Sequence, residues 1–192
     1  MSAATGNITA IKKGVMLCID PSSGGHGSHV GYALFDKGIL IEAGEVDMSD
    51  HWEQPVSVRL FHLSECLKQS FNVEVDLLVV EKIRSVNRGR AYTANHQLMW
   101  SIGAIQASIP HKKAVEIHSR TWQGVVSRTW SAYTKNDMHD AIGIGVGMIA
   151  LAWGYYPKKI NNKSQQELLE SKIKPKIREA LTSVERISSK DI

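Results

Sequence analysis

The sequence has little cysteine and no long apolar run, and both absences narrow its class. Only two of its 192 residues are cysteine, Cys18 and Cys66, and they form no CxxC pair, so a reducing setting is the simplest interpretation. Residues 1–14 lack the apolar centre of a signal peptide. The longest near-apolar stretch, residues 141–153, is shorter than the roughly 20 residues that cross a bilayer. We therefore expect a cytoplasmic protein (in the host cytoplasm if it is phage-encoded) without membrane insertion.

Positive charge is in excess only in parts of the chain. The formal net charge is +4, and residues 158–192 hold nine Lys or Arg against five Asp or Glu, so the preceding body, with 14 of each, is neutral. Within that body, a cationic cluster without any acid directly follows Glu81: Lys82, Arg84, Arg88 and Arg90. Positive charge beside carboxylates suggests a polyanionic substrate.

Two short apolar runs predict buried strands, and each is followed by a carboxylate. The first run spans residues 15–19 and precedes Asp20, Pro21 and a glycine-rich stretch. The second run, apolar almost throughout, spans residues 73–80 and precedes Glu81. Continuous apolar runs bounded by turn residues are typical of strands that are covered on both faces. Asp20 and Glu81 are therefore predicted at the carboxyl ends of two strands.

The other segments complete an α/β domain without internal repeats. Apolar residues alternate at 30–34 and 39–43 around a turn, which predicts a hairpin that continues an antiparallel sheet. A helix predicted over 55–71 separates the two buried strands, so these strands are expected to pair in parallel. Further elements are predicted as a helix over 98–109, a strand over 114–117 and a helix over 136–153.

We expect one core domain over residues 1–157 and a basic, helical tail over residues 158–192. A chain of this length suits one domain of about 100–200 residues. In the tail, a capping-box pattern at 164–167 precedes an apolar stripe at helical spacing, formed by Ile173, Ile177, Leu181 and Val184. A solvated helix is the simplest interpretation of the tail, and a dimer contact and a phosphate grip are alternatives.

Four acids are placed where they can meet at one edge of the sheet. Asp20 and Glu81 follow parallel neighbours, and Asp137 and Asp140 lie one turn apart at the start of the last core helix. Crowded carboxylates repel one another unless cations neutralise them, and hard oxygen ligands favour Mg²⁺ or Mn²⁺. Two ions about 4 Å apart can promote phosphodiester hydrolysis without a protein nucleophile. Taken singly, each acid could instead be a turn, cap or helix-dipole residue.

In this order, the acids resemble those of the RuvC-type Holliday junction resolvases of the ribonuclease H-like superfamily. The resemblance covers residues 15–151 and rests on four motifs: Ile19-Asp20-Pro21, Gly31-Tyr32, Val80-Glu81-Lys82-Ile83 and Asn136-Asp137-Met138-His139-Asp140-Ala141. It implies a mixed five-stranded sheet, with three antiparallel strands and then parallel strands, flanked by helices. It also implies that two Mg²⁺ ions per active site, replaceable by Mn²⁺, are bound by Asp20, Glu81, Asp137 and Asp140.

The resemblance further implies the substrate and the assembly. The expected activity is that of a crossover junction endodeoxyribonuclease, a homodimer that cuts symmetric strands of a four-way DNA junction. In this family the loop after Glu81 enters the junction, so we expect the cationic cluster that begins at Lys82 to bind DNA. A plain solvated loop is the alternative.

The sequence departs from the family pattern in three places. Ser22 replaces a glycine and is followed by a longer glycine-rich loop over residues 24–29, whose histidines we assign to a flexible turn rather than to a metal site. The segment before Asp137 is short and lacks clear counterparts of the family's lysines. Gln123 occupies one such place, and Lys135 could substitute. The basic tail is the third departure.

Cations and aromatic residues interleave in the segment before the last core helix: Arg120, Trp122, Arg128, Trp130, Tyr133 and Lys135. This composition is typical of surfaces that hold a DNA backbone and stack exposed bases. We therefore expect the three cations to bind DNA, whereas tryptophans packed in the core are an equal alternative. His139 points about 100° away from each neighbouring acid on an ideal helix, so it is interpreted as a neighbour rather than a metal ligand.

Two other functions fit parts of the pattern. In an actin-like ATPase or sugar kinase, the loop after Asp20 would bind phosphate, but those proteins need a second, duplicated domain that this length does not provide. A non-catalytic protein could bind branched DNA through the basic segments alone. Four-way junctions, flaps and forks all present bent backbones, so the sequence does not choose among them.

Overall fold

The computed structural model describes residues 10–21, 29–51, 53–82, 91–155 and 163–182. Their strands form one sheet in the order β3-β2-β1-β4-β5. The strands are β1 (Val15–Asp20), β2 (His29–Asp36), β3 (Ile39–Asp47), β4 (Leu77–Lys82) and β5 (Ala114–His118). The first three pair antiparallel, and β4 pairs in parallel with both β1 and β5. The predicted mixed five-stranded sheet is confirmed.

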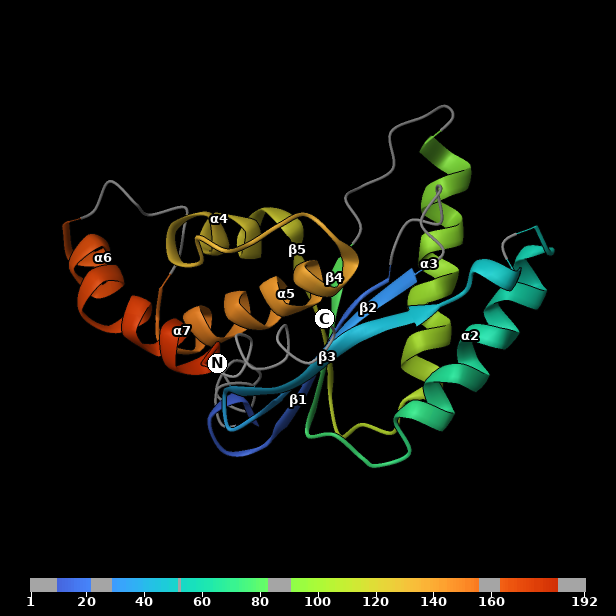
Figure 1. Ribbon diagram of the computed structural model, residues 1–192, viewed down its shortest axis with the longest axis horizontal. Coiled ribbons are helices and arrows are strands. Elements are labelled where there is room, and N and C mark those ends of the chain that lie inside the picture. The colour runs from blue at the N-terminus through green and yellow to red at the C-terminus, as the bar shows by residue number, and fades with distance from the viewer. Residues whose placement is uncertain (1–9, 22–28, 52, 83–90, 156–162, 183–192) are drawn as a thin grey trace, which may run out of the picture.

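Helices cover both faces of this sheet (Figure 1). One face carries α2 (Val56–Ser70), after the short 3-10 turn η1 (Ser49–His51), together with α3 (Ala91–Ser108). The other face carries α4 (Ser119–Thr129) and α5 (Asp137–Ala152), beside which lie α6 (Lys163–Leu168), the π-helical turn η3 (Leu169–Ile173) and α7 (Lys174–Ala180). Within the described part of the chain, no helix is long and apolar enough to cross a membrane.

Alternation along the two central strands divides the core in two. Successive side chains of a strand point to opposite faces of the sheet. The side chains that pack with α4 and α5 are Met16 and Cys18 of β1 and Leu77 and Val79 of β4. Those that pack with α2 and α3 are Leu17, Ile19, Leu78 and Val80. This parity decides toward which helices Asp20 and Glu81 extend.

Three element predictions need correction. Strand β4 begins at Leu77 rather than at residue 73. Before it, Val75 forms only an isolated bridge with His111, and the Asp76 side chain accepts a hydrogen bond from the backbone N of Val15 (2.9 Å) and pairs with Lys112 (2.7 Å). Helix α3 begins at Ala91, before the predicted residue 98. Helix α4 was not predicted, because its apolar stripe consists of only Trp122, Val125 and Val126.

The described part of the C-terminal segment, residues 163–182, is mainly helical, and the expectation that the segment is solvated is wrong for its apolar stripe. Ile173 and Ile177 are fully buried, and Leu181 is 9% exposed, in the core that α4 and α5 also form. Val184 lies outside the described residues. A π turn precedes Pro175 because proline has no N–H to donate to the carbonyl four residues earlier.

Helix α5 approaches its neighbours closely because three glycines face them. A Cβ at Gly145 would lie 2.1 Å from the Phe35 ring of β2, and Cβ atoms at Gly143 and Gly147 would lie 2.8 Å and 2.5 Å from Trp122 of α4. Phe35 and Trp122 are fully buried. The two aromatic side chains therefore fill the space that side chains on α5 would otherwise occupy.

Alanine substitution at Gly145 tests this packing. We expect Gly145→Ala to lower the free energy of unfolding by about 1–3 kcal/mol, because the new methyl overlaps a buried ring that cannot move away. The control is Gly103→Ala on the exposed face of α3, where nothing lies within 4 Å of the added atom. The control should stabilise by about 0.5–1 kcal/mol through helix propensity alone. Urea denaturation measures both, and equal stabilisation by both would contradict the packing.

Candidate active site

The strand register brings Asp20 and Glu81 side by side. Ile19 pairs in parallel with Val80, so the two acids occupy the next position on neighbouring strands. By alternation, Asp20 continues the face of Cys18, and Glu81 continues the face that packs with α4 and α5. Both acids are partly buried. They therefore extend from one sheet edge toward the helical layer that holds Asp137 and Asp140.

Gly31 brings the first turn of α5 against the sheet. Gly31 is the β2 partner of Asp20, and a Cβ on Gly31 would lie 1.9 Å from the carbonyl oxygen of Asp137. Only glycine permits this approach, because every other residue would push the helix away. The glycine of the Gly31-Tyr32 motif thus places the α5 acids next to Asp20.

Two side chains fix the N-terminus of α5. Asn136 caps the helix, and its side-chain oxygen accepts a hydrogen bond from the backbone N of His139 (2.7 Å). Glu45 of β3 accepts a hydrogen bond from the backbone N of Met138 (3.2 Å). Free N–H groups at a helix start need such acceptors. Glu45 was not predicted from the sequence, because it lies 93 residues away from Met138.

Two of the four acids accept hydrogen bonds from aromatic side chains. Trp122 Nε1 donates to Glu81 Oε2 at 2.9 Å, and the Tyr133 hydroxyl donates to Asp140 Oδ1. The two rings meet edge to face with centroids 6.3 Å apart. Trp122 is buried in the core, so for this tryptophan the core alternative is correct. Neither donor was identified from the sequence, where both belonged to the cation–aromatic segment.

The charges around Tyr133 support the convergence of the acids. Burial raises the pKa of the Tyr133 hydroxyl, and so do its hydrogen bond to Asp140 and the negative charges of Asp140, Asp20 and Glu81. Asp140, Asp20 and Glu81 therefore lie on the same side of the sheet as this hydroxyl and act on it electrostatically.

The two α5 acids resist ionisation. Burial raises the pKa of Asp137, and the charges of Glu45 and Asp140 raise it further. Burial also raises the pKa of Asp140, against the lowering effects of the Tyr133 hydrogen bond and of the Lys135 and His139 charges. Carboxyl groups with raised pKa values in one place are a common feature of functional sites.

The set of donors suits a hard cation in its chemistry, since all four side chains offer carboxylate oxygens. Within the described ranges, no group of three or more His, Cys, Asp or Glu side chains forms a ready-made metal cage. Glu81 and Asp140 are instead engaged by Trp122 and Tyr133. The metal-binding roles of the four acids therefore stay predictions.

The expected DNA-binding cations are only partly described. Arg84, Arg88 and Arg90 lie outside the described residues, as does the loop over residues 22–28. The other four expected cations are all exposed: Lys82, Arg120, Arg128 and Lys135. The Lys82 ammonium lies 3.7 Å from a carboxylate oxygen of Glu116, and the Arg128 guanidinium donates a hydrogen bond to the Gly124 carbonyl. His29 begins β2, with Nδ1 3.4 Å from Asp47.

This architecture is a ribonuclease H-like fold of the RuvC type, as predicted. Among solved structures, the chain is similar to T. thermophilus RuvC in complex with Holliday junction substrate, with a TM-score of 0.51, 15% identity, and coverage of 74% of this chain and 97% of that chain. It also matches a second Thermus thermophilus RuvC structure, with a TM-score of 0.48, 15% identity, and coverage of 72% and 94%. No protein-family model and no curated protein matches the sequence.

A double-mutant cycle tests the Trp122 hydrogen bond. Trp122→Phe keeps a ring in the core but removes the donor, so we expect it to lower the free energy of unfolding by about 1–3 kcal/mol. Combined with Glu81→Ala, it should show a coupling energy of about 0.5–3 kcal/mol in urea denaturation. Trp100→Phe, at a tryptophan 54% exposed, is the matched control. A coupling energy of zero would contradict the bond.

Neutralising Asp137 should stabilise the metal-free protein. The pKa of Asp137 is higher in the folded state than in the unfolded state, so ionisation of this group destabilises the folded protein. This loss of stability is absent at low pH, where the group is protonated in both states, and is complete above the folded-state pKa. In EDTA at neutral pH, Asp137→Asn should raise the melting temperature by roughly 2 °C. This gain should vanish as the pH falls through the carboxyl range. Calorimetry across pH measures the melting temperatures, and Asp50→Asn, at an exposed acid, is the control. The same change in melting temperature for both variants would contradict the predicted stabilisation.

Proposed function

We propose that the protein is a divalent-metal-dependent endonuclease that hydrolyses phosphodiesters in Holliday junctions and related branched DNA. The observation that carries this proposal is the placement of the acids: the strand register sets Asp20 and Glu81 side by side on the face of the sheet that α5 covers, and Gly31 lets the backbone of Asp137 pack against that face. The fold is shared with a RuvC solved in complex with a Holliday junction substrate. A homodimer in the cytoplasm, with one site for each cut strand, completes the proposal.

In this proposal the carboxylates of Asp20, Glu81, Asp137 and Asp140 hold two Mg²⁺ ions, which Mn²⁺ can replace. The bound ions would supply an activated water and stabilise the leaving oxygen. The remaining roles belong to the chain itself. Trp122 orients the Glu81 carboxylate and Tyr133 orients that of Asp140, so both acids are set before substrate arrives. Such supporting hydrogen bonds typically affect metal affinity about 10–100-fold.

The substrate enters as a polyanion, and the exposed cations are proposed to hold it. Lys82 ends β4 directly after Glu81, on the opposite face of the sheet by alternation, and Lys135 precedes the first turn of α5. Arg120 and Arg128 extend the positive charge along α4. Arg84, Arg88 and Arg90 continue it in the proposal. Positive charge around the acids offsets the repulsion between carboxylates and phosphates.

Cleavage of labelled DNA branches tests the activity. Wild-type protein should cut a four-way junction in Mg²⁺ or Mn²⁺ and leave it intact in EDTA. Asp20→Asn and Asp140→Asn should each reduce the cleavage rate by more than about a hundredfold, since each removes a metal-binding oxygen anion. Junction binding in Ca²⁺ should persist in both variants. Asp50→Asn, an exposed acid distant from the site in sequence, is the control and should cut normally.

The outcomes separate the competing functions. Full cleavage by the Asp20→Asn variant would rule out the proposed metal site. Junction binding that persists in EDTA, without cleavage in any divalent metal, would instead support a non-catalytic branched-DNA-binding protein. Symmetric nicks by a particle of twice the 21.3 kDa chain mass, measured by light scattering, would support true junction resolution over flap or fork cleavage.

A further inference from the structure

A groove of about 810 Å³ lies next to the candidate active site, between the C-terminal end of α4 and helix α7. Trp130 and His139 line it on the side of the nuclease core, and Lys174 and Arg178 line it on the side of α7. His139 directly precedes Asp140 in α5. One residue that lines the groove thus directly precedes a predicted metal-binding acid in the sequence. The C-terminal segment forms the other side of the groove.

We propose that this groove binds a single DNA strand next to the cleavage centre, with phosphates on Lys174 and Arg178 and an unstacked base on Trp130. This inference rests on the proposed function and adds a binding surface to it. Lys174 and Arg178 lie one helical turn apart, so both extend from one face of α7. A cationic wall opposite an indole is the combination that binds single-stranded nucleic acid with little sequence preference.

The wall that carries Trp130 is fixed by hydrogen bonds and ring contacts. The His139 ring lies 5.0 Å from the Trp130 ring, and Trp130 meets Tyr133 edge to face at 5.7 Å. The backbone N of Thr134 donates to His139 Nδ1 at 3.1 Å. The indole is thus held in place before any base arrives.

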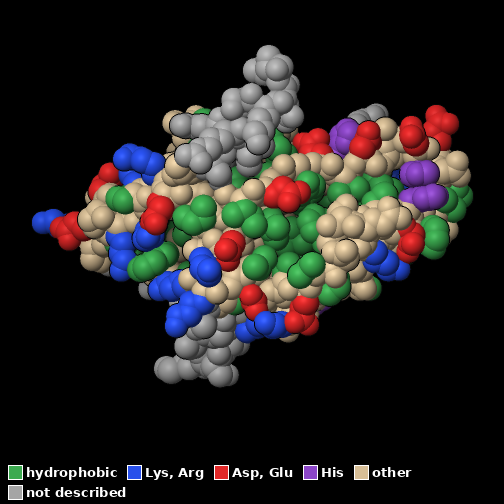
Figure 2. All heavy atoms as spheres, turned by 60° about the horizontal axis from the view of Figure 1, so that its bottom comes forward, with side chains coloured by type: hydrophobic (Ala, Val, Ile, Leu, Met, Phe, Trp, Pro, Cys, Tyr) green, Lys and Arg blue, Asp and Glu red, His purple; other side chains and the backbone are tan. Residues whose placement is uncertain are grey.

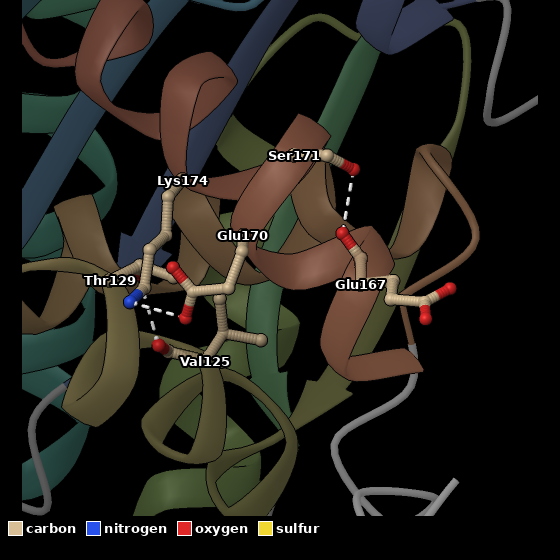
Figure 3. Close-up of polar contacts among 6 residues, drawn as sticks. All are labelled: Val125, Thr129, Glu167, Glu170, Ser171 and Lys174. Carbon is tan, nitrogen blue, oxygen red and sulfur yellow. Dashed lines mark hydrogen bonds and ion pairs between the residues drawn. The ribbon is translucent and has the colours of Figure 1, made fainter. Parts of the chain in front are cut away.

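On the opposite wall, Lys174 can exchange its ion pair with Glu170 for a phosphate. Figure 3 shows Lys174 paired with Glu170 where η3 and α7 pass the end of α4, at a distance of 2.6 Å. An ion pair this exposed contributes little to stability, so a phosphate can compete for the lysine. Arg178 offers a planar fork that suits phosphate oxygens. Figure 2 shows Lys and Arg side chains gathered toward this end of the molecule.

The same helical segment supplies a matched control. Lys172 and Lys176 do not line the groove and lie over the Trp153 ring instead, 4.6 Å and 5.7 Å from its centroid. Each pair of cations contains one lysine that is ion-paired, Lys174 with Glu170 and Lys176 with Glu179. Changing either pair to Gln therefore removes the same charge from the same segment, on different flanks.

The experiment compares K174Q/R178Q with K172Q/K176Q in the full chain. Anisotropy measures binding of a labelled four-way junction and of a labelled single strand in Ca²⁺ at several KCl concentrations. The groove pair should weaken single-strand binding about tenfold more than the control pair, and should lower the salt slope by roughly 1.4, as expected for two lost phosphate contacts. Trp130→Ala should weaken it by about tenfold through lost stacking. Melting temperatures verify that every variant folds.

Each result is decisive. If both pairs weaken binding equally, or neither does, the groove does not bind DNA, and junction cleavage by the wild type in the same preparations leaves the proposed nuclease intact. If the wild type binds no DNA, the groove proposal fails together with the proposed function. If the wild type binds but cuts nothing, only the nuclease proposal fails, and the comparison of the two pairs still decides the groove.

Discussion

The close contact between α5 and β2 is the constraint on which the site depends. Gly31 lets the carbonyl of Asp137 approach the strand that pairs with Asp20, and Gly145 admits the Phe35 ring beneath the same helix. A larger residue at either place would move α5 outward and separate its two acids from the strand acids. The glycines that face Trp122 have a second effect, because they let this indole reach Glu81. Core packing and site geometry are therefore one set of contacts.

An aromatic row connects the core to the surface beside the acids. It begins at Trp122, fully buried, and continues through Tyr133 and Trp130 to His139, with neighbouring centroids 5.0–6.3 Å apart. Its first two members donate to acids, which offsets part of the cost of burying carboxylates. The pKa of Asp140 stays above its ordinary value, because burial raises it more than the hydrogen bond from Tyr133 lowers it. Functional sites commonly lower the stability of the folded protein in this way.

Local pattern predicted the sheet and the placing of the acids, because both depend on short-range periodicity. Apolar runs identified the strands that end near Asp20 and Glu81, and the cap and spacing identified the start of α5. The face of the sheet that Asp20 and Glu81 share was not predicted, because both strands are apolar on both faces and only the packed structure shows which helices cover each face. Helix α4 was not predicted, because it has only three apolar residues, Trp122, Val125 and Val126, although all three are buried. The bond from Trp122 to Glu81 spans 41 residues, a separation that no local pattern reports.

The two halves of the core differ in how much of the chain they require. The half beneath α2 and α3 is built from residues between Leu17 and Ile109, whereas the half beneath α4 and α5 draws on residues from Ile11 to Leu181. During synthesis the first half can close while the second still waits for its last helix, for a time on the order of ten seconds at ribosomal rates. In the nascent chain, one face of the sheet is thus already covered by α2 and α3 while the face that packs with α4 and α5 is still exposed. The face that holds the acids is the last to be finished.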